Sequence, residues 1–217
     1  MHGYQNTLKK VTGKNWRGKF EPLPSRRTKC SVGGDVIFYS DECSKVVKRL
    51  ILPHGILSSL DFVWGGTQMR VLSVYRPYVG AKEAEGALRT LAQSIVPGFE
   101  KRLWEEMLKP SAVKTLIGGD LNMGTAPVDF KVTGTDYKRI PFQGVTSTYR
   151  NMGDKKFVST TIDHVLSNTK GGEAWVSSDG LFVGDHFPII GVLCADRAPP
   201  RRGKKGNGET TSYNQGR

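Results

Sequence analysis

Short apolar runs, separated by glycines and prolines, mark the middle of the chain. They predict strands over residues 36–39 and 46–52. Residues 60–64 and 69–75 are apolar as well, and they flank Gly65-Gly66-Thr67. Because glycine readily adopts the positive φ of a tight turn, this segment is predicted to be a β-hairpin.

The longest helical pattern covers residues 81–109. Apolar side chains first recur at helical spacing at Ala84, Leu88, Leu91, Ala92 and Ile95. Pro97-Gly98 interrupts the pattern, and a second apolar face follows at Phe99, Leu103, Trp104 and Met107. This segment is predicted to be core-facing helix without a role in chemistry.

Three further strands are predicted over 113–117, 160–166 and 188–193. Strands that alternate with helix in this way favour an α/β sandwich. The 217 residues suit one domain with tails. We expect a weakly structured basic arm over 1–15, a domain over 16–195 and a disordered basic tail over 196–217.

Basic residues are concentrated in the two ends of the chain. The net charge of +12 divides into +7 for residues 1–29, +4 for residues 196–217 and only +1 between them. Residues 1–29 are expected to be weakly structured, with Trp16 and Phe20 as their large apolar anchors. Basic ends favour contact with a polyanion such as nucleic acid, although they also serve solvation alone.

Neither a membrane span nor a secretory signal is apparent in the sequence. No segment approaches the roughly 20 apolar residues that cross a bilayer, and residues 1–10 contain no apolar core of a signal peptide. Cys30, Cys43 and Cys194 lack metal-site spacing and cannot all pair. We therefore expect an intracellular protein with reduced thiols, in the nucleus or cytoplasm, that is not secreted.

Three polar clusters stand at the predicted strand ends. In Gly118-Gly119-Asp120-Leu121-Asn122, alternation points the carboxylate and the amide to the same side, although such residues are also ordinary in turns. Asp163 lies in an apolar strand and needs a partner such as an imidazole. Asp185-His186 precedes the last strand, where a possible metal ligand stands beside a possible general base.

In chain order, the three clusters resemble the endonuclease/exonuclease/phosphatase superfamily, which has a DNase-I-like four-layer α/β sandwich. Val71–Pro77 resembles the strand of that family that ends in Tyr-x-Pro, and Gly33–Phe38 resembles its GGVAIF strand. The likeness extends from about Trp16 to Leu193 and is greatest to the endonuclease domains of LINE-type retrotransposons and to apurinic endonucleases.

The resemblance implies contacts with the scissile phosphate. Tyr75 and Asn122 would touch this group, and Asn122 would also hold the carboxylate of Asp120. Thr148 stands where LINE-type members place a threonine near the phosphate.

The resemblance also implies catalytic and metal-binding roles. Asp120 would orient the attacking water or protonate the leaving oxygen, and Asp163 would orient His186. His186 would polarise the phosphate or assist the water, and Asp185 would bind or adjoin a divalent cation. The cofactor would be Mg²⁺ or Mn²⁺, hard cations that prefer oxygen ligands.

The opening of the family's fold has no counterpart in the pattern. Its first strand ends in an asparagine and a later one ends in Gln-Glu, which supplies a metal ligand; no such strands precede Trp16. The fold is thus expected to be N-terminally incomplete. The leading hypothesis is a metal-dependent endonuclease of nucleic acid, with DNA as the expected partner, whose activity the missing glutamate would impair. Two alternatives are a non-catalytic nucleic-acid-binding remnant and a phosphatase of the same superfamily.

Overall fold

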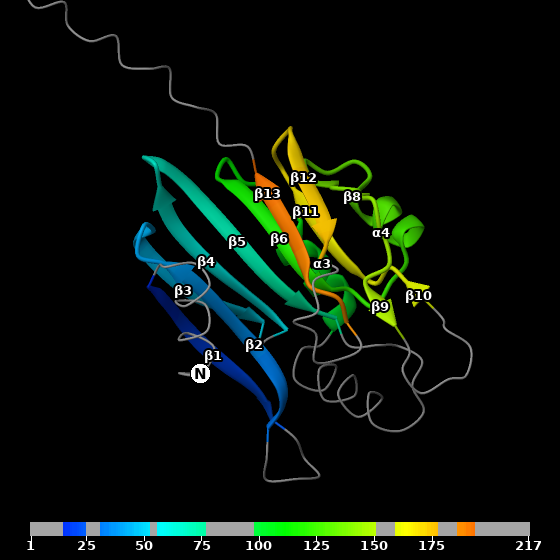
Figure 1. Cartoon of the computed structure of the whole chain (residues 1–217), viewed down its shortest axis with the longest axis horizontal. Coiled ribbons are helices and arrows are strands. Elements are labelled where there is room, and N and C mark those ends of the chain that lie inside the picture. Colours follow the sequence, from blue (N-terminus) through cyan, green and yellow to red (C-terminus); the bar gives the residue numbers. More distant parts are fainter. Residues whose placement is uncertain are drawn as a thin grey trace, which may run out of the picture.

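The computed structural model describes residues 15–24, 31–52, 56–76, 98–150, 159–177 and 186–193. Its largest element is a six-stranded sheet with the order β3-β4-β5-β6-β11-β7 (Figure 1). The strands are β3 (Ser44–Leu52), β4 (Leu57–Trp64), β5 (Thr67–Tyr75), β6 (Lys114–Asp120), β11 (Asp163–Ser167) and β7 (Lys138–Arg139). β5 and β6 are parallel, and the other pairs are antiparallel.

Two helices cover one face of this sheet. They are α3 (Phe99–Met107) and α4 (Thr125–Val132). Alternate strand residues point to opposite faces, so Leu72, Val74 and Ile117 share the helical side. The core there includes these side chains and their helical partners, Phe99, Leu103, Trp104, Met107, Val128 and Val132. Within the described ranges, no helix is long and apolar enough to span a membrane.

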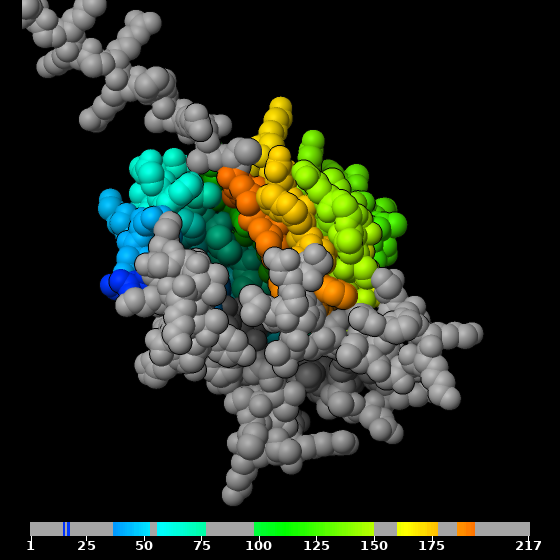
Figure 2. All heavy atoms as spheres, viewed as in Figure 1, coloured from blue at the N-terminus to red at the C-terminus, as the bar shows by residue number. Residues whose placement is uncertain are grey.

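Two smaller sheets lie on the opposite side. One has the order β13-β12-β8, formed by β13 (Ile189–Leu193), β12 (Gly172–Val176) and β8 (Phe142–Gln143). The other pairs β1 (Trp16–Pro24) with β2 (Ser31–Ser40). A second core joins the three-stranded sheet to β11, centred on Ile140, Phe142, Val165 and Ala174. In Figure 2, teal atoms of β4 and β5 are visible between the orange atoms of β13 and the blue atoms of β2 and β3.

This arrangement confirms the predicted α/β sandwich. The hairpin of β4 and β5 is confirmed, with Gly65 and Gly66 at positive φ. The second half of the predicted helix is confirmed as α3; its first half, residues 81–97, lies outside the described residues, as does the tail.

Two sequence expectations differ from the structure, and several elements were not predicted. Residues 16–24 are not weakly structured but form β1, because their backbone pairs along β2. The strand expected over 160–166 divides into β10 (Ser159–Thr160), which pairs with β9 (Tyr149–Arg150), and β11. The strand divides because the backbone N–H of Ile162 turns to the Thr148 hydroxyl. α4, β12 and the two-residue strands β7, β8 and β9 were not predicted.

Candidate active site

The end of the six-stranded sheet gathers three of the predicted site residues. Tyr75 on β5 is in register with Asp120 on β6, and Asp120 is in register with Asp163 on β11. Residues directly opposite one another point to the same face of a sheet. All three side chains therefore lie on the side that carries the three-stranded sheet.

His186 reaches the same place from that second sheet. It precedes β13 and forms an isolated antiparallel bridge with Tyr149. The next residue strengthens this link, since the Phe187 N–H donates to the carbonyl of Thr148 at 2.6 Å. The backbone thus fixes His186 across the gap between the sheets.

Asp163 and Asp120 flank the imidazole of His186. The Nδ1 atom of His186 lies 2.9 Å from Oδ2 of Asp163, and its Nε2 atom lies 3.9 Å from Oδ2 of Asp120. The His186 side chain is 37% exposed, whereas those of Asp163 and Asp120 are only 11% and 14% exposed. Because a carboxylate accepts, Nδ1 carries the proton and Nε2 carries the lone pair. The ring can therefore take a proton at Nε2, the nitrogen that faces Asp120.

Asn122 fixes the carboxylate of Asp120. Its backbone N–H donates to Oδ1 at 2.8 Å, and its Nδ2 donates to Oδ2 at 3.1 Å. Asn122 has a positive φ of 47°, which asparagine tolerates better than most residues. The turn after β6 therefore holds the carboxylate and the amide as one unit.

Thr148 acts behind the site rather than at its surface. Its side chain is fully buried. Its hydroxyl accepts the backbone N–H groups of Ile162 and Asp163, each at 3.0 Å. These bonds fix the start of β11, and thus the position of Asp163. The structure therefore supports a positioning role for Thr148 in place of the expected phosphate contact.

Sequence reasoning missed one neighbour of His186. The ring of Tyr149 meets the imidazole edge-on, with centroids 5.0 Å apart. No local motif marks Tyr149; the bridge between β9 and His186, three residues before β13, brings the two together. The predicted metal ligand Asp185 lies outside the described residues.

The carboxylates of the site fit a hard divalent cation. One ligand atom from each of Asp120, Asp163 and His186 lies within 4.8 Å of the others. Carboxylate oxygens suit Mg²⁺ and Mn²⁺, whereas imidazole suits softer transition metals. The two aspartates would therefore hold the cation, with water and substrate oxygens completing its shell, and His186 remains suited to proton transfer.

His164 lies beside the site but is buried in the core. It is 1% exposed, its Nε2 bonds to the carbonyl of Met123 at 2.7 Å, and its buried Nδ1 has no partner. Burial lowers the pKa of His164 below its ordinary value. The residue is thus a neutral structural histidine.

This buried histidine predicts a pH dependence of stability. Its pKa is lower folded than unfolded, so the unfolded chain binds more protons just below pH 6.5. The free energy of unfolding should therefore fall as the pH drops through this range. His164→Phe should flatten that slope, measured by urea unfolding between pH 7 and about 5. An unchanged slope in the variant would contradict the assignment.

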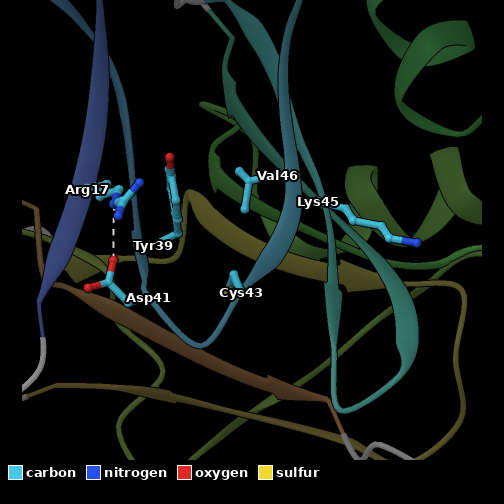
Figure 3. A pocket seen from close by; sticks show the side chains of 6 residues that line it. All are labelled: Arg17, Tyr39, Asp41, Cys43, Lys45 and Val46. Carbon is cyan, nitrogen blue, oxygen red and sulfur yellow. Dashed lines mark hydrogen bonds and ion pairs between the residues drawn. The ribbon is translucent and has the colours of Figure 1, made fainter.

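A hollow of about 320 Å³ opens where β1, β2 and β3 meet. It lies away from the site. The start of β3 pairs with the end of β4, which in turn pairs with the start of β5, whereas Tyr75 lies at the other end of β5. Arg17 is paired with Asp41 there at 3.1 Å. Figure 3 shows the side chain of Lys45 pointing away from this pair. Because its cations do not converge, we assign this hollow no ligand.

Comparison with solved structures shows which proteins share the fold. The structure is similar to an endonuclease/exonuclease/phosphatase family protein from Leptotrichia buccalis, with a TM-score of 0.58 and 13% identity over 88% of this chain and 76% of that chain. It is also similar to TDP2 from D. rerio, solved with a single-strand DNA product (TM-score 0.52, 12% identity, 86% of this chain and 80% of that chain).

A third similar structure is a mannosyl-6-phosphatase from Bacteroides thetaiotaomicron (TM-score 0.51, 15% identity, 88% of this chain and 82% of that chain). No protein-family model matches the sequence, and no curated protein matches it. At such low identities the similarity shows the fold, which is the DNase-I-like α/β sandwich. Both nucleic-acid-processing proteins and phosphatases use it.

Proposed function

We propose that this protein is a divalent-metal-dependent phosphodiesterase that cleaves nucleic acid, of the retrotransposon endonuclease type. One observation carries the proposal: His186 lies between Asp163 and Asp120, at 2.9 Å and 3.9 Å. A base oriented by one carboxylate and facing a second one is suited to activating water.

The hydrolysis needs a proton acceptor and a held phosphate. A water between Nε2 of His186 and Oδ2 of Asp120 lies within hydrogen-bond reach of both. His186 takes its proton as the oxygen attacks phosphorus, and Asp163 stabilises the resulting imidazolium. The bond from phosphorus to the leaving oxygen breaks, and this oxygen takes a proton from solvent water, while His186 later returns its own proton to solvent. The phosphate is held by Tyr75, because both N–H groups of the Asn122 amide already donate to Asp120 and to the carbonyl of Arg76.

A divalent cation would supply stabilisation of the negative charge that builds up on the phosphate. Asp120 and Asp163 are the described residues that would hold it, together with Asp185 as the sequence resemblance implies. Asn122 orients the Asp120 carboxylate through two donors, so the ligand oxygen would be held in place before the ion binds.

Charge favours nucleic acid as the substrate. The two ends of the chain together account for most of the net charge of +12, and cationic segments bind a phosphate backbone by releasing its counterions. One protein with a similar fold was solved with a single-strand DNA product. A polymeric phosphodiester, mainly DNA, therefore suits this chain better than a small phosphate ester.

Cleavage of supercoiled plasmid and of an abasic duplex tests the proposal. We expect nicking with Mg²⁺ or Mn²⁺ and none with excess chelator. Asp120→Asn, purified identically, serves as a control for contaminating nuclease. It retains the shape of the side chain but lacks the anionic ligand, so activity should fall roughly 10- to 100-fold. Equal nicking by both proteins would refute the assignment.

The phosphatase alternative is favoured by the similarity to a mannosyl-6-phosphatase. Release of inorganic phosphate from sugar phosphates, without plasmid nicking, would establish it. The binding-remnant alternative predicts salt-sensitive DNA binding without hydrolysis of either substrate. The same protein sample therefore distinguishes all three functions.

A further inference from the structure

We propose that Arg76 is a positioning residue for the Asp120–Asn122 unit, an inference that rests on the function proposed above. Arg76 follows the last residue of β5 and is 7% exposed. Its backbone N–H donates to the carbonyl of Asp120 at 2.8 Å, and its carbonyl accepts Nδ2 of Asn122 at 2.8 Å. One residue therefore contacts both members of the unit.

The guanidinium of Arg76 holds the turn itself. Its Nη1 atom donates to the carbonyl of Leu121 at 3.1 Å and to that of Asn122 at 3.4 Å. These carbonyls belong to the turn in which Asn122 has its positive φ of 47°. Such a conformation persists only where the surroundings determine it. Arg76 thus stabilises the backbone geometry that aims the Asn122 amide at Asp120.

Glu100, in the first turn of α3, holds the other side of the guanidinium. Its carboxylate accepts Nε of Arg76 at 2.9 and 3.2 Å, and it also accepts Nε1 of Trp104 at 3.2 Å. A planar guanidinium can serve a carboxylate and backbone carbonyls at the same time, whereas the point charge of a lysine cannot. The helix is thereby connected to the catalytic turn through one side chain.

Arg76→Lys tests this role, with Arg70→Lys as the matched control. Arg70 lies in the middle of β5 and, like Arg76, pairs with a carboxylate, that of Asp61. Two measurements are made: the kinetics of plasmid cleavage, and the NMR signal of the Asn122 side-chain amide, assigned with Asn122→Asp. The NMR measurement needs no activity.

For Arg76→Lys we expect the Asn122 signal to move and kcat to fall at least about 10-fold, because small misplacements of catalytic groups are costly. KM should stay within about 2-fold, since Arg76 contacts the turn rather than the phosphate. Arg70→Lys should change neither signal nor kcat. If Arg76→Lys does not fold, Glu100→Gln replaces it, with a smaller shift of the same signal expected.

An unmoved Asn122 signal overturns the positioning role, and so does an unchanged kcat in an active enzyme. A raised KM with unchanged kcat also overturns it, because Arg76 would then bind substrate directly. If the wild-type protein cleaves nothing, the proposed function fails. A moved Asn122 signal would then still show that Arg76 positions Asn122. An unmoved signal would refute this positioning as well as the proposed function.

Discussion

Replacing His186 with alanine is expected to lower kcat for phosphodiester cleavage by roughly 100- to 10,000-fold, the usual contribution of a positioned general base. The imidazole is the only group in the described part of the site that pairs with a carboxylate at Nδ1 while facing a second one. Its removal leaves the water without a proton acceptor. Single-turnover cleavage in saturating Mn²⁺ measures the effect.

Asp163→Asn tests whether the orientation of the His186 imidazole matters, because this variant keeps the imidazole but changes its hydrogen-bond partner. An amide can donate to Nδ1, which would place the proton on Nε2 and remove the lone pair from the side of the water. The variant should therefore approach the loss seen for His186→Ala, although the imidazole remains; saturating Mn²⁺ offsets the weaker metal binding that loss of the Asp163 carboxylate also causes. If Asp163→Asn cleaved normally while His186→Ala did not, the proton-transfer role would give way to direct contact with the phosphate.

The DNA affinity of His186→Ala shows whether His186 acts in catalysis or in substrate binding. The basic ends of the chain supply the charge for binding, so the affinity of His186→Ala should remain within a few-fold of wild type at fixed salt. A large loss of binding would instead place His186 in the substrate-binding surface. Wild-type cleavage in this variant would refute the mechanism.

Sequence pattern predicted strands well where apolar runs end in glycine turns, as at Gly65-Gly66. It missed β1, because Trp16–Pro24 contains two prolines and charged residues, and its strand conformation depends on pairing with β2. It missed α4 because Thr125–Val132 lacks an apolar stripe and carries Pro127. That proline is tolerated because first-turn N–H groups have no intrahelical partner. Contacts with distant parts of the chain therefore determine that these segments form a strand and a helix.

The candidate site shows the same division. Asp120, Asp163 and His186 stand in short motifs at strand ends, and the register of the sheets brings them together. Thr148 and Arg76 act through hydrogen bonds to residues 15 and 46 positions away in the chain. No local pattern encodes such contacts. The sequence thus identified the side chains suited to the chemistry. The structure was needed to identify Thr148 and Arg76, which hold those side chains in position.

Gly119→Ala is expected to destabilise the protein by about 2–5 kcal/mol, the range of overpacked and strained substitutions. Gly119 lies on β6 with a φ of 149°, where side chains are strained. An added Cβ would stand 1.9 Å from the carbonyl oxygen of Val74 on the neighbouring strand. The backbone of β5 or β6 would have to move. Thermal unfolding should show a melting temperature lower by on the order of 10 °C.

The adjacent glycine provides the control. An added Cβ at Gly118 would meet no atom within 4 Å, and its φ lies outside the positive range. Gly118→Ala should therefore change stability by less than about 1 kcal/mol. If the two variants unfolded alike, close packing of β5 on β6 would not be the reason for the glycine. If they differ as expected, Gly119 allows the close pairing that sets Tyr75 beside Asp120.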